Sequence, residues 1–333
     1  MRYHLLAVVV LLLLIVLGVY SYLHHSSSVR YLDTDPAYNR AYWKERIEAT
    51  GSADTYAEFT ERNQRAEQGR QHFSAHVIGA LIAEKEGASG ITICDAAFGF
   101  GCYHGLFGDL IAKGGDAMVA DLDAACLSKF GPLGTGCQHG IGHGVLEYTG
   151  YDAITEALEL CGHTTQVVPL LGCTSGVFME YNTPLAGPSD ALVPSIRTFD
   201  AEAPYRPCTD IAQKYQSSCY FELGHWFRIT LNDDYERIGE LCGALASSAR
   251  THCFLGVGAM IGPMEEYDVP KARAACATFK ADDENYCRAG LRWSLYQVPE
   301  QRSQAVLACE DSDPVRVQAC ELFGDLTEGA EGD

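Results

Sequence analysis

The sequence is poor in basic residues, with 24 lysines and arginines against 44 aspartates and glutamates and a net charge of −20. Electrostatic binding to nucleic acids or to anionic membrane surfaces requires clustered positive charge. The deficit therefore excludes a nucleic-acid partner bound by charge. It suits solubility or cationic partners.

Three familiar chemical motifs are also missing. The chain contains no HExxH pair of the zinc proteases, no glycine-flanked serine elbow and no C-x2-C spacing. These motifs mark metalloprotease, serine hydrolase and zinc-thiolate sites respectively. Any catalytic or metal-binding chemistry must come from a different set of residues.

One long apolar run stands at the start of the chain. Leu5 to Leu23 is nineteen residues long and carries no charge, enough at about 1.5 Å per residue to cross a bilayer core of about 30 Å. Residues 1–23 are therefore predicted to be a signal anchor or transmembrane helix, followed by a tether and entry helix over 24–67. A cleaved signal peptide is the alternative, although no A-x-A site follows the run.

All fourteen cysteines lie after this apolar run. An even number of cysteines behind an export signal is typical of disulfides formed in an oxidising compartment. The chain is therefore predicted to be membrane-anchored, with its bulk outside the cytoplasm, in the periplasm or the extracellular space. The cysteines fall into seven local pairs: Cys94 and Cys102, Cys126 and Cys137, Cys161 and Cys173, Cys208 and Cys219, Cys242 and Cys253, Cys276 and Cys287, and Cys309 and Cys320.

The spacing of these pairs predicts the fold class. Successive pairs recur about every 34 residues, the period of stacked helical hairpins. Helices pack 8–10 Å apart, so a disulfide can join two of them only where they converge at a turn. Each first cysteine is expected in the last turn of one helix and each second cysteine in the first turn of the next. The prediction is an all-α fold, an α-solenoid of about seven disulfide-stapled αα hairpins over residues 68–328.

One segment interrupts this period. Residues 182–207 contain five prolines and have no helical periodicity. Proline-rich segments of this kind are loops. The insertion is predicted to be either a lid over a binding surface or a spacer.

The period and the local cysteine pairs resemble secreted, disulfide-stapled Sel-like repeat proteins, which are related to tetratricopeptide arrays. The resemblance covers about residues 70–325 and is one of build. Most pairs here are C-x10-C, whereas the C-x7-C spacing of those repeats occurs only at Cys94 and Cys102. The resemblance implies helical hairpins with one disulfide each, and it carries no function with it.

Aligning the units on their second cysteine, taken as position 0, shows a glycine column. An upstream unit without cysteines, from Ser74, fits the same frame and makes eight units. Position +3 is glycine in five of them. Glycine inside a helix costs about 1 kcal/mol relative to alanine, so its recurrence predicts close approach of a neighbouring helix.

Histidines concentrate at two other positions, +2 and +6, which lie one turn apart on the same helix face. Equivalent positions of adjacent repeats stack side by side, so these histidines are predicted to face a shared surface. Histidines four residues apart can bind one zinc or copper ion, with a third ligand from a neighbouring helix. The candidate metal ligands are His72, His76, His104, His139, His143 and His225.

Two other interpretations of these histidines remain open. They could act without a metal, with His104, His139 and Glu147 as candidate catalytic residues and Glu180 as a companion. They could instead only pack and hydrogen-bond between repeats. Imidazoles of His104, His139 and His143 within about 5 Å of one another would favour a site, because one ion must be reached by all three.

Together these observations predict a membrane-tethered, extracytoplasmic binding scaffold made of helical repeats. Its inner surface would bind a protein or peptide ligand and would also carry a metal site lined by histidines. The alternative function is a cell-surface or periplasmic enzyme that uses a His/Glu cluster and depends on copper or zinc. The membrane would be contacted through the N-terminal helix alone.

Overall fold

The computed structural model describes residues 36–64, 68–131, 134–165, 170–184, 196–298, 300–311 and 313–324. The predicted membrane helix, and the tether before residue 36, lie outside these ranges. Within them, none of the helices has the length and apolar character needed to span a membrane.

The described part of the chain is mostly helical and contains no strand. Two entry helices, α2 (Pro36–Thr50) and α3 (Ser52–Asn63), pack against each other and against α4 (Gln68–Glu86). In α3 the inward face carries Tyr56 and Phe59, one turn apart, both buried. This spacing at one helix face is why the segment can form a stable amphipathic helix.

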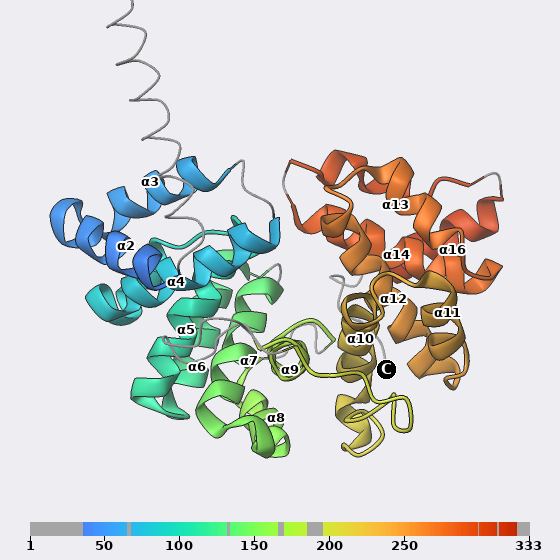
Figure 1. Cartoon of the computed structure of the whole chain (residues 1–333), viewed down its shortest axis with the longest axis horizontal. Coiled ribbons are helices and arrows are strands. Elements are labelled where there is room, and N and C mark those ends of the chain that lie inside the picture. Colours follow the sequence, from blue (N-terminus) through green and yellow to red (C-terminus); the bar gives the residue numbers. More distant parts are fainter. Residues whose placement is uncertain are drawn as a thin grey trace, which may run out of the picture.

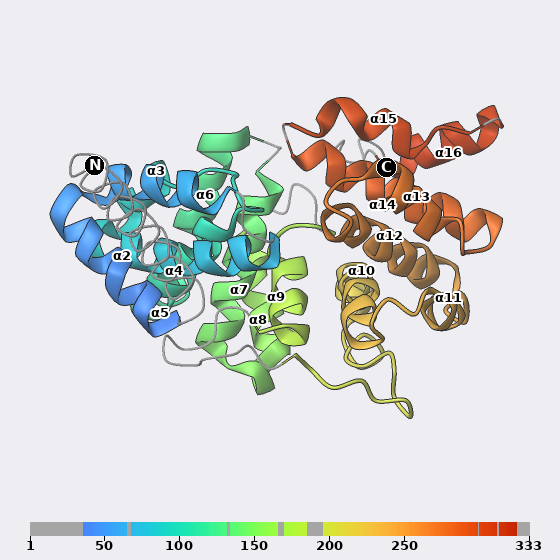
Figure 2. The same ribbon diagram turned by 45° about the horizontal axis from the view of Figure 1, so that its top comes forward.

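A row of mostly long helices then runs through the molecule, each in contact with the next. The N-terminal and C-terminal helices lie at opposite ends of this row (Figure 1, Figure 2). The row consists of α4, α5 (Gly101–Gly114), α7 (Thr135–Thr149), α9 (Cys173–Asn182), α10 (Gln213–Thr230), α12 (Ser247–Met264), α14 (Ala281–Gln297) and α16 (Pro314–Gly324).

A second set of shorter helices packs beside this row. All but the last contact the two row helices that flank them in sequence, and α15 contacts α14. They are α6 (Ala117–Phe130), α8 (Ile154–Leu160), α11 (Tyr235–Gly243), α13 (Val269–Cys276) and α15 (Ala305–Ala308). Four 3-10 turns complete the described elements: η1 (Gly87–Thr92), η3 (Tyr151–Ala153), η4 (Cys161–His163) and η5 (Arg302–Gln304).

The helix pair α13 and α14 follows directly from its sequence. The Asp268 carboxylate accepts a hydrogen bond from the Lys271 backbone N–H at 3.1 Å and so caps α13, with Pro270 in the first turn. Both are standard helix-start signals, since they satisfy or remove N–H groups that have no partner within the helix. These signals account for the start of α13 at Val269.

All seven predicted disulfides are present, each joining Cα atoms 5.5–5.7 Å apart. Every one closes a short local loop of the chain. No cysteine is left unpaired. Such a set indicates an oxidising environment, secreted or extracytoplasmic.

The cysteines do not all occupy the predicted helix positions. Cys94 and Cys208 lie in turns outside any helix, and Cys219, Cys253 and Cys287 lie in the second turn of their helices and not in the first. The second helix of these units begins before its cysteine, because the polar residues ahead of the cysteine are already helical.

The Pro-rich insertion departs from the hairpin pattern most. Its first residue, Asn182, ends α9, and its described residues 196–207 form no helix. Arg197 nevertheless fixes it to the row: its guanidinium lies 3.6 Å from the centre of the Trp226 ring, and its carbonyl accepts the Trp226 indole N–H at 2.9 Å. Whether residues 185–195 form a lid falls outside the described residues.

The glycines of the row helices explain how closely the helices approach. A Cβ added at Gly256 would overlap the backbone carbonyl of Phe221, and one added at Gly224 would overlap that of Cys253. Each helix of the pair thus places a glycine under a carbonyl of the other, an arrangement we call a glycine clasp. The predicted role of position +3 is confirmed here, and position +5 supplies the reciprocal glycine.

Four pairs of neighbouring row helices have such a clasp. The glycine at +5 of one helix meets the carbonyl at position 0 of the next, and the glycine at +3 of the second meets the carbonyl at +2 of the first. The clasps are Gly79 with Gly105 (α4 and α5), Gly142 with Gly176 (α7 and α9), Gly224 with Gly256 (α10 and α12), and Gly258 with Gly290 (α12 and α14).

Three neighbouring pairs of the described row helices lack this clasp: α5 with α7, α9 with α10, and α14 with α16, where position +5 of α14 is Arg292. Position +5 is Phe107 in α5 and Phe178 in α9, and both rings are buried. At the α5 and α7 contact, a Cβ on Gly140 would meet the His104 imidazole at 2.8 Å and not a backbone carbonyl. The space between these helices is therefore filled by a histidine side chain.

Candidate metal centre

Five of the six predicted histidine ligands converge between α4, α5 and α7. His72 and His76 come from α4, His104 from α5, and His139 and His143 from α7. They form two sets of three imidazoles that share His104, and within each set the candidate ligand atoms lie within 4.8 Å of one another. The second set, His104, His139 and His143, thus meets the distance of about 5 Å that was expected for a functional site.

Three ring nitrogens of the first set face one another. His76 Nε2 lies 3.0 Å from His72 Nε2 and 3.2 Å from His104 Nδ1. A neutral imidazole carries a single N–H. One proton on His76 Nε2 is enough to satisfy both contacts. A metal ion at this point would take the place of that proton and be bound by the three nitrogens.

A left-handed loop fixes the orientation of His72. Phe98, Gly99 and Phe100 have φ values of 55°, 61° and 64°, a conformation that is costly for aromatic residues. Phe98 is held edge-on against Phe59, with ring centres 5.6 Å apart. The loop thereby presents the Phe98 carbonyl to the His72 Nδ1–H at 2.7 Å, leaving Nε2 with its lone pair toward the cluster.

The second set has its own orienting group on α9. His143 Nδ1 donates to the Glu180 carboxylate at 2.8 Å, and both side chains are fully buried. The Tyr151 hydroxyl donates to the other carboxylate oxygen. A carboxylate on one imidazole nitrogen is the usual partner of a metal-binding histidine, because it fixes the tautomer and makes the other nitrogen more basic.

His139 also contacts α9. Its Nε2 lies 3.4 Å from Met179 Sδ. Each of His72, His139 and His143 is therefore oriented by a residue on a neighbouring segment.

Four of the five histidines are held in the neutral form that metal binding requires. Burial lowers the pKa of His72 to about 4, although the hydrogen bond to Phe98 acts in the opposite direction. Burial, reinforced by the neighbouring histidines, also places the pKa of His76, His104 and His139 well below the ordinary value. At neutral pH these imidazoles have lone pairs available.

Several of these nitrogens have no hydrogen-bond partner within the described part of the chain. They are His76 Nδ1, His104 Nε2, His143 Nε2 and His225 Nε2. Buried polar atoms are nearly always paired, so such a cluster calls for an explanation. A bound cation would satisfy the nitrogens that face the cluster.

His225, the sixth predicted ligand, lies outside both sets of three. Its Nδ1 donates to the Glu222 carboxylate at 2.8 Å, and Ser175 on α9 donates to the same carboxylate. His225 stands apart because α9, which contacts both α7 and α10, carries no histidine and has Ser175 and Met179 at positions +2 and +6. Glu222 occupies position +3 of α10, so α9 and α10 meet through side chains.

Glu147, a candidate catalytic residue, is partly buried on α7. Its pKa is raised to about 7 by burial first, and then by the charges of Glu180 and Asp109. A carboxyl group with a pKa near 7 can exchange protons at neutral pH.

Replacing Glu147 by glutamine is expected to change how stability depends on pH. The pKa of Glu147 in the folded state is about 7, above the ordinary value of 4.5, so the folded state binds this proton more tightly than the unfolded state does. Proton binding therefore stabilises the fold at low pH, and this stabilisation is lost as the pH rises from 4.5 through 7. Between pH 5 and pH 8, the free energy of unfolding of the metal-free wild type should therefore fall by about 2 kcal/mol relative to that of the Glu147→Gln variant. Denaturant unfolding at both pH values measures this difference.

The control is Glu156→Gln, which removes an exposed carboxylate on α8. It should follow the wild type at both pH values. Parallel wild-type and Glu147→Gln curves would show that Glu147 titrates as an ordinary surface carboxylate.

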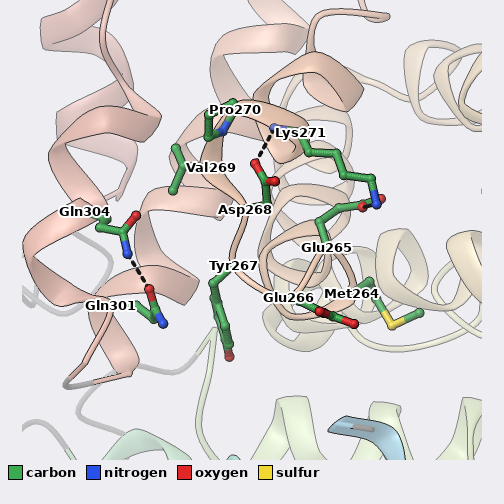
Figure 3. Close-up of a pocket in the computed structure, with 10 residues that line it drawn as sticks. All are labelled: Met264, Glu265, Glu266, Tyr267, Asp268, Val269, Pro270, Lys271, Gln301 and Gln304. Atoms are coloured by element: carbon green, nitrogen blue, oxygen red, sulfur yellow. Dashed lines mark hydrogen bonds and ion pairs between the residues drawn. The ribbon is translucent and has the colours of Figure 1, made fainter.

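A separate surface hollow lies in the C-terminal half of the molecule, far along the chain from the histidines. It is lined by residues 264–271 between α12 and α13, with Gln301 and Gln304 (Figure 3). Its charged groups partly neutralise one another, since Lys271 pairs with Glu265. No histidine lines it, and it offers no set of converging ligands.

The structure changes two aspects of the predicted site. The histidines lie buried between helices and not on an open inner surface, with His143 fully buried and His104 only 3% exposed. The sequence interpretation also missed Met179, Tyr151 and Glu222. Met179 had a usable signal, because it occupies position +6 of its unit, the same position as His143 and His225.

Comparisons of the chain with protein families, curated proteins and solved structures found no match. The fold and the site therefore define the class by themselves. It is an all-helical, disulfide-bonded protein with a buried histidine cluster that could bind a metal.

Proposed function

We propose that this protein is an extracytoplasmic binding protein for a transition-metal ion, copper or zinc, held at the histidine cluster. The observation that carries the proposal is the pair of three-histidine sets that share His104. Imidazole nitrogen is a preferred ligand of both metals, and three imidazoles are a common protein contribution to one ion.

Three features of the surroundings support a cation. Burial lowers the pKa values of His72, His76, His104 and His139, so these four imidazoles are neutral at pH 7. His72 and His143 are oriented through Nδ1, so that Nε2 is available to the ion. The buried Glu180 carboxylate accepts a hydrogen bond from His143 Nδ1 and so stands directly behind one ligand of the second set.

The rest of the chain acts as the scaffold in this proposal. The row of clasped helices is an α-solenoid built from disulfide-stapled hairpins, and residues 1–23 tether it to a membrane. The surface of the row would serve a protein or peptide partner, such as one that delivers or receives the metal.

An enzymatic role is a second candidate, and Glu147 is the residue that favours it. Three histidine ligands leave a position on the ion open for water or substrate. Glu147 lies one helical turn beyond His143 and has a pKa of about 7, which suits a general base. A Glu147→Gln variant that binds metal normally would separate a catalytic role from metal binding.

Metal analysis of the purified, disulfide-intact protein tests the proposal. After chelation and reloading, we expect stoichiometric copper or zinc in the wild type and a loss in a His139→Ala/His143→Ala double variant. Binding at 1,000 times Kd should stabilise the fold by about 4 kcal/mol, seen as a rise in melting temperature.

The control for this experiment is His163→Gln. His163 is exposed in η4 and lies outside both histidine sets, so this variant should bind metal as the wild type does. A wild-type protein that retains no stoichiometric metal would overturn the proposed function.

A further inference from the structure

We propose that Met179 is a fourth ligand at the His104, His139 and His143 set, and that its thioether makes this site selective for copper over zinc. This inference rests on the proposed function, because it names the metal that the same cluster holds. Met179 lies on α9, the residue before Glu180. Two consecutive residues of α9 thus contact the same set of histidines, Met179 at His139 and Glu180 at His143.

The distance between the two candidate ligand atoms fits a shared ion. His139 Nε2 and Met179 Sδ lie 3.4 Å apart. Metal bonds of about 2.1 Å to nitrogen and about 2.3 Å to sulfur, at an angle between 90° and 110°, separate the two atoms by roughly 3.1–3.6 Å. An ion bound by both atoms would need little movement of either side chain.

Backbone packing holds these two residues in register. A Cβ on Gly176 would overlap the His139 carbonyl, and one on Gly142 would overlap the Cys173 carbonyl. This glycine clasp fixes α7 against α9 within two turns of both side chains. Met179 is also only partly exposed, so its sulfur has limited freedom to leave the site.

The ligand set determines which metal is preferred. A thioether is a soft, neutral ligand that binds copper, above all Cu(I), and contributes little to zinc sites. Three imidazoles alone accept either metal. Met179 is therefore the residue that would discriminate between them.

The test compares the wild type with Met179→Leu, a change of similar volume that removes the sulfur. Cu(I) is supplied anaerobically as its acetonitrile complex, so that no thiol reductant reaches the disulfides, and its Kd is measured by competition with a chromophoric chelator. We expect the Cu(I) affinity to fall at least about tenfold while the zinc affinity stays within about twofold. Met264→Leu, at an exposed methionine of α12, is the matched control.

X-ray absorption at the copper edge gives an independent readout, because it identifies the copper ligands in the wild type without any substitution. Selenomethionine-labelled wild type should show a copper–selenium contact, and the labelled Met179→Leu protein should not. This measurement stands even if Met179→Leu folds poorly, because the labelled wild type alone reports the ligand.

The outcomes separate the two proposals. Copper bound without sulfur or selenium contact, together with unchanged Cu(I) affinity in Met179→Leu, overturns the role of Met179 and leaves the histidine site intact. Equal losses of copper and zinc affinity also contradict selectivity. A wild type that binds neither metal overturns both the proposed function and this inference.

Discussion

Replacing His104 by glutamine is expected to abolish tight metal binding at both histidine sets. His104 belongs to both sets of three, so its loss leaves two imidazoles in each. Losing an orienting partner alone lowers metal affinity by about 10–100-fold, and loss of a shared ligand should raise Kd by more than about 100-fold. Isothermal titration of metal-free protein with copper and with zinc measures the effect.

Glutamine is chosen because it keeps a polar side chain in a buried position. His104 is only 3% exposed and lies against His76 and Gly140. Circular dichroism and the melting temperature of the metal-free variant show whether the fold survives. A folded His104→Gln protein that binds metal as tightly as the wild type and as His163→Gln would place the metal site elsewhere in the chain.

Replacing Gly256 by alanine is expected to destabilise the protein by at least about 3 kcal/mol. The added Cβ would overlap the carbonyl oxygen and the carbonyl carbon of Phe221 in α10, and both are backbone atoms within a helix. Relief therefore requires the two helices to move apart, which also disturbs the reciprocal contact of Gly224 with Cys253. Overpacking that side chains can absorb costs about 1–3 kcal/mol, and here no side chain can yield.

Gly243→Ala is the matched control. Gly243 ends α11, and no atom lies within 4 Å of its added Cβ. Alanine has the higher helix propensity, so this variant should be neutral or slightly more stable. Denaturant unfolding of both variants with disulfides intact gives the comparison, and similar stabilities would show that the clasp tolerates a methyl group.

The cysteine spacing was enough to predict the disulfide pairing and the helical class. Each pair lies 8–12 residues apart, and only a tight turn between neighbouring segments brings Cα atoms to 5.5–5.7 Å over such a distance. Helix ends were harder to place. The residues before Cys253 and Cys287 are polar and resemble a turn, but they form the first turns of α12 and α14.

The site was predictable in its main members, because positions +2 and +6 of stacked helices must come together. The burial of the histidines was not predictable, since a repeat alignment does not give the distance between adjacent helices. That distance depends on position +5, where Gly142 allows a clasp and Phe107 prevents one. His225 is separated from the other histidines by α9, which contacts both α7 and α10 and carries no histidine.

The orienting groups were missed for a different reason. The Phe98 carbonyl reaches His72 only through a left-handed loop, and Tyr151 reaches Glu180 from a short 3-10 turn. Neither conformation follows from local sequence preference. Glu180 was noted as a possible companion of the histidines, but its pairing with His143 required the actual packing of α7 on α9.

The local disulfides also bear on how such a chain can change in length. Because each bond closes within a short stretch, the chain can be cut between any two of them without separating a bonded pair. Duplication or deletion of a segment of about 34 residues would add or remove two cysteines together and leave no odd thiol to form wrong pairs. Bonds between distant segments would forbid such events, so this architecture can gain or lose units in evolution without disturbing its oxidative folding.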